Sequence, residues 1–220
     1  MNKKHEYNHT KFLQDIHIEL LISAISHAYR EAKRDGRYLC HIRDYYIVML
    51  LLYTGLRRSE LCQLKIQDIE IREKRLTVVS GKGGKTRTIQ LTPDTINLIL
   101  SLLDDKVKIL KEPVGPNKPL LLSGHMRPYH PDTIYKRIKL WFKKCGLPGE
   151  LSPHSLRHTH ACIMLESGQV SLLQVKQLMG HSRITTTEAY LHVRRDGLPN
   201  INFNKGYNID TTNKRKKRKA

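Results

Sequence analysis

Hydrophobic positions near the start of the chain recur at the spacing of an α-helix. From Phe12 to about Tyr29 these positions predict a helix, and Asp35-Gly36 supplies the turn that ends it. They are Leu13, Ile16, Leu20, Ile22, Ala24, Ile25 and Ala28. A second segment, from Ile42 to about Tyr53, is apolar on several faces. Helices of that kind are usually buried on all sides, so we expect this one to lie at the centre of the domain.

The segment T-G-L-R-R-S-E-L follows the central helix and predicts a sharp turn into a short third helix. Gly55 permits the backbone to leave the helix abruptly, and Ser59 suits the start of the next one. Arg57 therefore lies at a junction between two rigid elements. A junction of this kind can hold an arginine toward a ligand, although many helix junctions carry an arginine for structural reasons alone.

Between Ile66 and Leu91 the pattern changes to short β-branched segments, D-I-E-I, L-T-V-V and R-T-I-Q-L, separated by R-E-K-R and G-K-G-G-K-T. Partial alternation of apolar and polar residues predicts three antiparallel strands. Lys82 and Lys85 fall on the second turn, where flanking glycines let a hairpin tip approach a ligand closely. A nucleotide-binding P-loop is excluded because it requires glycine at the position that Val79 occupies.

Helical patterns dominate the second half of the chain. Thr92-Pro93-Asp94 caps a helix that reaches about Leu110, a proline-rich linker follows, and another helix is predicted from Pro131 to about Cys145. The predicted fold class is therefore α+β, mainly α-helical, with a small three-stranded antiparallel sheet. The 131–145 helix carries several basic residues, for which a solvated face and a DNA-backbone contact are equally good interpretations: Lys136, Arg137, Lys139, Lys143 and Lys144.

The segment L-S-P-H-S-L-R-H-T-H-A-C-I-M-L-E places cationic residues where a helix would face inward. Buried cations are costly unless an anion meets them, so this stripe indicates an anion site. His181 and Tyr190 follow within the next segments of the chain. Taken singly, each of these residues is better explained by packing, and the anion-site interpretation depends on taking them with the segments upstream. The stripe consists of His154, Arg157, His158, Ala161 and Leu165, at positions i, i+3, i+4, i+7 and i+11.

The charge balance narrows the identity of that anion. The 220 residues include 39 Lys and Arg against 20 Asp and Glu, for a net charge of +19. The run Lys214–Lys219 contributes only part of this excess. A body this basic favours a polyanion, most plausibly nucleic acid, because neutralising phosphates releases counterions. Binding to a membrane surface is the weaker interpretation, since no predicted helix combines a basic face with an exposed aromatic one.

The cysteines, the N-terminus and the apolar runs indicate the cellular location of the protein. The cysteines Cys40, Cys62, Cys145 and Cys162 form no C-x-x-C pair, which favours buried free thiols in a reducing compartment over a zinc site. The polar N-terminus is not a signal peptide, and the longest apolar run is too short to span a bilayer. We therefore expect a cytoplasmic protein, in a bacterial, phage or plasmid context, with residues 1–10 as a flexible leader.

Five motifs in order resemble one known family: T-G-L-R-R-S-E-L, G-K-G-G-K-T-R on a hairpin, H-S-L-R-H, L-M-G-H-S and T-x-x-Y. The chain resembles the catalytic domain of the tyrosine recombinases, or phage-type integrases, from about Thr10 to Val193. This implies a catalytic domain over 11–195 and a C-terminal segment over 196–220 with a disordered basic tail. The family's helical core-binding domain normally precedes the catalytic domain, and nothing long enough for it lies ahead of Phe12.

The resemblance implies roles for individual residues. Two arginines would clamp the scissile phosphate, a hairpin lysine and two histidines would assist, and a tyrosine would be the nucleophile. Two further residues would orient this set, and basic residues on the hairpin and on the 131–145 helix are candidates for DNA contact. By position the catalytic set is Arg57, Lys82, His154, Arg157, His181 and Tyr190; the orienting residues are Glu60 and His158; the DNA-binding candidates are Lys85, Arg87, Lys136 and Arg137.

The chemistry of these residue types suits DNA strand exchange. Guanidinium forks match the non-bridging oxygens of a phosphate better than an ammonium does. A lysine on a movable hairpin can protonate the leaving 5′ oxygen. Because the 3′-phosphotyrosyl ester retains the energy of the diester, rejoining needs no ATP, and no metal or other cofactor is required. Lys85 remains an alternative to Lys82, and Tyr207 an alternative to Tyr190, whereas a zinc-protease site is excluded because Ser155 stands where glutamate is needed.

The predicted function is site-specific cleavage and rejoining of DNA during recombination or integration. The implied partners are double-stranded DNA with a specific site and further copies of the chain, as a dimer or tetramer, and an accessory DNA-bending protein is compatible with them. No membrane partner is expected. Two alternatives stay open: a binding protein on the same fold that does not cleave DNA, and a type IB topoisomerase that relaxes DNA without sequence preference.

Overall fold

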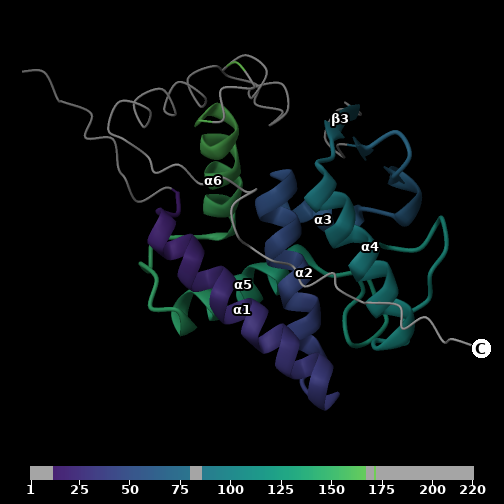
Figure 1. The fold of residues 1–220 in the computed structure, drawn as a ribbon, viewed down its shortest axis with the longest axis horizontal. Coiled ribbons are helices and arrows are strands. Elements are labelled where there is room, and N and C mark those ends of the chain that lie inside the picture. The colour runs from purple at the N-terminus through teal and green to yellow at the C-terminus, as the bar shows by residue number, and fades with distance from the viewer. Residues whose placement is uncertain (1–11, 80–85, 167–170, 172–220) are drawn as a thin grey trace, which may run out of the picture.

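The computed structural model describes residues 12–79, 86–166 and 171. Within these residues a mainly helical fold carries one small sheet, as the sequence predicts (Figure 1). The helices are α1 (Asp15–Asp35), α2 (Leu39–Thr54), α3 (Arg58–Gln63), α4 (Pro93–Lys108), α5 (Pro131–Lys144) and α6 (Pro153–Glu166), with a short 3₁₀ turn at Ile66–Asp68; the strands are β1 (Ile69–Glu70), β2 (Arg75–Val79) and β3 (Thr86–Gln90).

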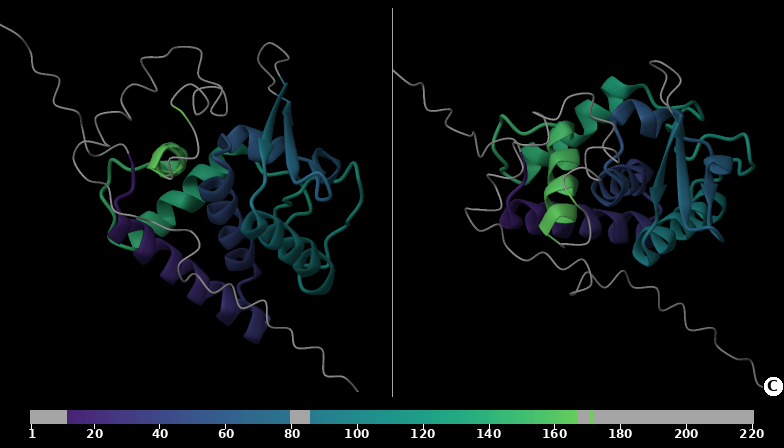
Figure 2. Two further views of the ribbon diagram at one scale, coloured as in Figure 1. Left: turned by 45° about the horizontal axis from the view of Figure 1, so that its top comes forward. Right: turned by 90° about the horizontal axis from the view of Figure 1, so that it is seen from above.

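Helix α2 is the centre of the fold, as its apolar character predicts. Every residue from Ile42 to Leu52 is buried. Helices α1, α5 and α6 pack on one side of α2, while α3, α4 and the sheet lie on the other (Figures 1 and 2). At its C-terminal end, Gly55 takes the left-handed backbone conformation, with φ of 61°. That glycine turns the chain toward α3, so the end of α2 and the start of α3 lie next to each other.

Helix α1 begins at Asp15, three residues later than its hydrophobic pattern predicts. Phe12 and Leu13 are buried but precede the helix, because apolar contact alone does not require helical backbone. The backbone N–H of Leu13 donates to Thr159 Oγ1 on α6 over 2.9 Å. Gly36 ends the helix in the left-handed conformation, as predicted.

The three strands form an antiparallel sheet in the order β1-β2-β3. Leu76 pairs with Ile89, and Val78 pairs with Arg87. Directly opposed residues of an antiparallel pair point to the same face, so Arg87 shares the inner face with these buried apolar residues. Arg75, two positions from Thr77 on β2, lies on the outer face.

In the second half of the chain, a capping residue starts α4 and polar side chains join α5 to α2. Thr92 caps α4 by accepting a hydrogen bond from the backbone N–H of Thr95, with Pro93 at the first helical position. Helix α5 is anchored to α2 through Asp44, which accepts hydrogen bonds from Arg137 and, over 2.8 Å, from Trp141 Nε1. Arg137 therefore points toward α2 with most of its side chain covered, whereas the sequence predicted a DNA contact for it.

Two of the other basic residues of α5 make contacts within the fold. Lys139 donates to the carbonyls of Gly149 and Leu151, at 2.6 and 2.9 Å, and Lys144 lies over the ring of Trp141. Lys136 is exposed. Lys143 and Lys144 are exposed as well, so the solvated-face interpretation fits part of this helix, whereas Arg137 and Lys139 are held by contacts within the fold.

All four cysteines lie in the described residues and are free thiols, as predicted. Cys62 and Cys162 are buried, but Cys40 and Cys145 are only half-buried, so the expectation of burial holds for two of them. Among the helices of the described residues, none has the length and apolar character that crossing a bilayer would need. The predicted leader 1–10 and C-terminal segment 196–220 lie outside the described residues.

Candidate active site

Arginines from three separate elements gather around Glu60 on α3. Arg57 precedes this helix, Arg87 comes from β3, and Arg157 comes from α6. The short helix α3 starts immediately after the turn at Gly55, which brings Glu60 against the end of α2. The sequence predicted Glu60 as an orienting residue near Arg57, and the structure places it at the contact point of the cationic residues.

The carboxylate of Glu60 receives four hydrogen bonds. Oε1 accepts from Arg57 Nη1 at 2.8 Å and from Arg87 Nη1 at 2.7 Å. Oε2 accepts from the backbone N–H of Arg57 at 2.7 Å and from Arg87 Nη2 at 2.8 Å. An ionised carboxylate offers about four lone-pair sites, so these donors saturate it. Burial alone would raise the pKa of Glu60, but the bonds from Arg87 and Arg57 lower it to about 2.

Arg157 is buried beside this carboxylate. Its side chain is 2% exposed, and Nη1 donates to the carbonyl oxygen of Gly55 and lies 3.9 Å from Glu60 Oε2. Arg57 is more open, with 36% of its side chain exposed. One arginine of the predicted pair is thus fixed inside the fold, and the other reaches the surface next to it. The structure therefore brings Arg57 and Arg157 together, although they are far apart in the sequence.

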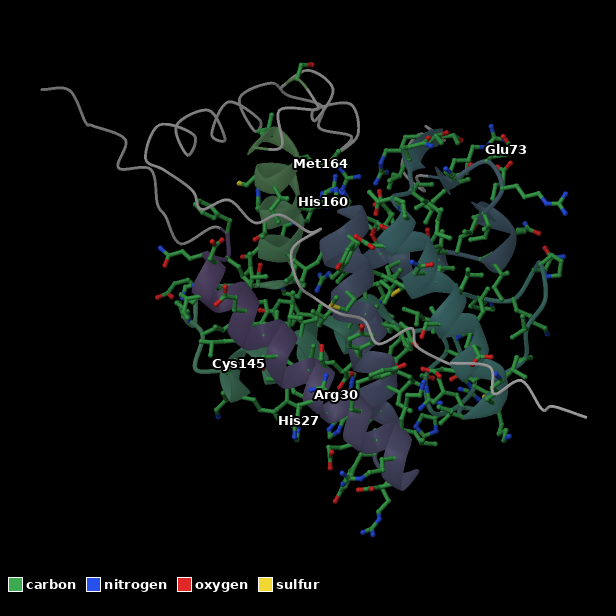
Figure 3. All side chains as sticks on the ribbon, viewed as in Figure 1. His27, Arg30, Glu73, Cys145, His160 and Met164 are labelled. Atoms are coloured by element: carbon green, nitrogen blue, oxygen red, sulfur yellow. The ribbon has the colours of Figure 1, made fainter. Side chains whose placement is uncertain are left out.

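The contact between α2 and α6 includes His160, whose role the sequence does not indicate. Figure 3 labels His160 on α6. The residue is buried, and its Nδ1–H donates to the carbonyl oxygen of Leu52 over 2.8 Å. Burial lowers the pKa of His160 to about 4, so the ring is neutral at pH 7. The ring packs against Gly55, whose carbonyl holds Arg157. The only sequence signal was a third histidine in H-S-L-R-H-T-H.

His154 and His158 lie on another face of α6, with their rings edge to face and their centroids 4.6 Å apart. His154 is exposed and His158 half-buried, so the prediction that both face inward with Arg157 is wrong for His154. The pKa of His154 is lowered, chiefly because the ring is partly desolvated and to a smaller extent because Arg157 and Arg57 are positively charged. A neutral imidazole at the surface, close to two guanidiniums, can accept a proton or a hydrogen bond.

Lys82, Lys85, His181 and Tyr190, and the alternative Tyr207, lie outside the described residues. Across the ranges 12–79 and 86–166, no group of three or more His, Cys, Asp or Glu side chains is arranged to hold a metal ion. The placed residues offer guanidinium donors and a neutral imidazole around one surface, which suits an oxyanion such as a phosphate.

The low pKa of Glu60 gives a stability prediction. The difference between the ordinary 4.5 and about 2, at ~1.4 kcal/mol per pH unit, corresponds to about 3 kcal/mol of folding free energy at neutral pH. Since the pKa is depressed in the folded state, this contribution is present above pH 4.5 and is lost as the pH falls toward 2. Glu60→Gln should therefore unfold more easily than the parent chain at pH 7.

Urea denaturation of both proteins between pH 3 and pH 7 measures this difference. We expect the gap in unfolding free energy to narrow steadily below about pH 4.5. Glu70→Gln is a matched control, since Glu70 also pairs with an arginine, Arg75 of the sheet, but its side chain is 38% exposed against 6% for Glu60. A gap that stays constant over the whole pH range would show that the ionised carboxylate of Glu60 is not what stabilises this junction.

Sequence comparison identifies the family. The profile of the phage integrase family matches residues 18–196, most of the chain. The chain belongs to the phage integrase family. A tyrosine recombinase of Pseudothermotoga lettingae is 35% identical over 151 residues, which are 69% of this chain and 50% of the relative. The tyrosine recombinase XerA of Pyrococcus furiosus is 39% identical over 156 residues, covering 69% and 51%.

Solved structures give the same fold for this phage integrase family member. The crystal structure of XerA recombinase aligns with a TM-score of 0.65 and 31% identity, covering 84% of this chain and 63% of that one. XerH bound to a palindromic difH substrate aligns with a TM-score of 0.68 over 89% of this chain and 53% of XerH, at 23% identity. The chain spans about half the length of the curated relatives it matches.

Proposed function

We propose that the chain cleaves and rejoins DNA at a specific site through a covalent 3′-phosphotyrosyl intermediate, with Tyr190 as the nucleophile. The observation that carries this proposal is the meeting of Arg57 and Arg157 on Glu60. Two guanidiniums at one surface, one buried and one partly open, form a preorganised site for a single phosphate. Membership of the phage integrase family supports the reaction type.

The arginines would act on the charge that develops during cleavage. As a phosphodiester is attacked, negative charge increases on the non-bridging oxygens, and forked N–H donors stabilise it most where water is excluded. Arg157 is already desolvated, so its donors need little reorganisation. Neutral His154 can take a hydrogen bond or proton at the same surface.

The remaining roles would belong to residues outside the described ranges. Tyr190 would attack phosphorus, the 5′ oxygen would leave with a proton from Lys82, and His181 would bind the phosphate. The bond from the Tyr190 oxygen to phosphorus would form as the bond from phosphorus to the 5′ oxygen breaks, and His154 would accept the phenol proton. Attack by a second 5′ hydroxyl reverses the step. No nucleotide cofactor is consumed, because the ester replaces a diester of similar energy.

The relatives support a DNA partner and self-association. One solved structure is XerH bound to difH, and another is a lambda integrase dimer bound to a COC′ core site. We infer that this chain also binds a specific duplex site as two or more copies, in the cytoplasm. The basic excess of the chain, +19 overall, fits such a partner.

A nicked duplex that traps the covalent intermediate tests the proposed function. The scissile strand carries a nick close to the cleavage position, so the short product diffuses away and rejoining stops. Tiled nicked duplexes from the DNA that flanks the encoding gene are incubated with the chain in EDTA without ATP. We expect a protein–DNA adduct that survives SDS with the wild-type chain, and none with Tyr190→Phe, which should still bind the duplex.

The alternatives give different results in the same experiment. Retarded DNA without any covalent adduct across the tiled set would contradict cleavage and favour a binding protein. Relaxation of supercoiled plasmids that lack the adduct-forming site would favour a topoisomerase, whereas dependence on one short inverted repeat supports site-specific recombination.

A further inference from the structure

Arg87 on β3 is more deeply placed than a DNA-contacting residue of a hairpin should be. Its side chain is 13% exposed and lies on the inner face of the sheet, opposite Val78. Both terminal nitrogens donate to the two oxygens of Glu60, at 2.7 and 2.8 Å. This is the bidentate arrangement that binds a carboxylate most firmly. The sequence had suggested Arg87 as a DNA-binding residue.

Those two bonds complete the hydrogen-bonding capacity of Glu60. Arg57 supplies the other two donors, one from its side chain and one from its backbone. A carboxylate has about four lone-pair sites, so these four donors match its hydrogen-bonding capacity. Arg157 Nη1 stands 3.9 Å from Oε2, too far for a hydrogen bond, and donates to the Gly55 carbonyl instead.

We propose that Arg87 is a positioning residue: its two bonds hold the Glu60 carboxylate and thereby fix Arg57 and Arg157 in the positions from which they would contact the phosphate. This inference rests on the proposed function and adds a residue to it. Without Arg87, two acceptor sites of a buried carboxylate would open beside Arg57 and Arg157. Buried acceptors gain strongly from a charged donor, so these guanidiniums would turn toward Glu60 and away from a bound phosphate.

The first measurement is the single-turnover cleavage rate of Arg87→Ala on a nicked duplex that traps the wild-type chain. We expect a loss of about 10–100-fold, because a displacement near 1 Å in a catalytic group costs that much. The DNA dissociation constant should change little. Its salt dependence should also match the wild-type chain, whereas losing a direct phosphate contact would lower the log–log slope by about one.

A double-mutant cycle tests the mechanism of the effect. If Arg87 acts by holding the Glu60 carboxylate, neutralising that carboxylate removes the reason for the defect. Glu60→Gln/Arg87→Ala should therefore cleave at least as fast as Arg87→Ala alone, so the two losses are far from additive. Arg87→Lys should recover part of the rate, since an ammonium can still contact one oxygen.

Arg75→Ala is the matched control. Arg75 belongs to the same sheet and also pairs with a glutamate, Glu70, but it lies on the outer face with 47% of its side chain exposed. We expect wild-type cleavage from this variant. Melting temperatures of all variants, measured in the same buffer, identify any loss that reflects unfolding, and Arg87→Lys serves where Arg87→Ala does not fold.

Other results of these measurements would contradict the positioning role of Arg87. Wild-type cleavage by Arg87→Ala, or losses that multiply in the double variant, would overturn the positioning role. A reduced salt slope with weaker binding would instead establish Arg87 as a direct DNA contact. Absence of any adduct with the wild-type chain would remove the proposed function and this role with it, which separates the two failures.

Discussion

Replacing Arg157 with lysine should lower the rate of DNA cleavage by about 10²–10³-fold, the usual effect of losing one preorganised donor to a developing oxyanion. Arg157 is 2% exposed and already holds the Gly55 carbonyl with one nitrogen. The planar guanidinium can donate to this carbonyl with one nitrogen and present its other N–H donors to a phosphate. A lysine carries the same charge on one compact ammonium, which cannot reach both positions.

The measurement is single-turnover cleavage of the nicked duplex at saturating protein. DNA binding should persist, since one buried arginine contributes little to the overall basic surface. Arg34→Lys is a control, because Arg34 is an exposed arginine of α1 paired with Glu31 and Asp35. A rate for Arg157→Lys within about threefold of the wild-type rate would mean that charge alone suffices and that the fork has no catalytic role.

Replacing Gly55 with alanine should destabilise the fold by about 3 kcal/mol and abolish most cleavage, through strain and overpacking together. Gly55 has a φ of +61°, which disfavours any side chain, and an added Cβ would lie 2.5 Å from His160 Cδ2. The ring cannot move away cheaply because it is buried and bonded to the Leu52 carbonyl. The displaced backbone includes the acceptor of Arg157.

Thermal unfolding measures this effect, and about 3 kcal/mol corresponds to a fall in melting temperature of roughly 6–12 °C for a domain of this size. Gly36→Ala is a close control, since Gly36 has a φ of +66° but nothing within 4 Å of an added Cβ. Gly36→Ala should lose only the unfolding free energy that corresponds to the strained backbone, about 1 kcal/mol. Equal losses in the two variants would show that the contact with His160 does not matter.

Local patterns in the sequence were sufficient to predict the elements. The apolar run around Val48 predicted the buried central helix, and the alternation around Leu76 predicted a strand. Capping residues such as Thr92 and Gly36 gave helix ends because their hydrogen bonds and backbone conformations are local. The start of α1 was placed too early, since Phe12 is buried without being helical.

Long-range pairing was the part that the sequence could not specify. Nothing near Arg87 in the chain indicates a bidentate contact with Glu60, and nothing near Arg137 indicates Asp44. From the sequence alone both are candidates for a DNA contact, because an arginine on a basic segment fits a buried ion pair and a phosphate contact equally well. The role of His160 was missed for a related reason: its partner, the Leu52 carbonyl, is a backbone group that any sequence would supply.

The nucleophile is the most direct point at which to test the whole proposal. After trapping on the nicked duplex, nuclease and trypsin digestion leave a nucleotide on the peptide that was joined to DNA, and tandem mass spectrometry locates it. We expect the modified peptide to be 184–194, I-T-T-T-E-A-Y-L-H-V-R, with the nucleotide on Tyr190. Modification of Tyr207 in peptide 206–214, or of a serine or histidine, would contradict the assignment of Tyr190 as the nucleophile.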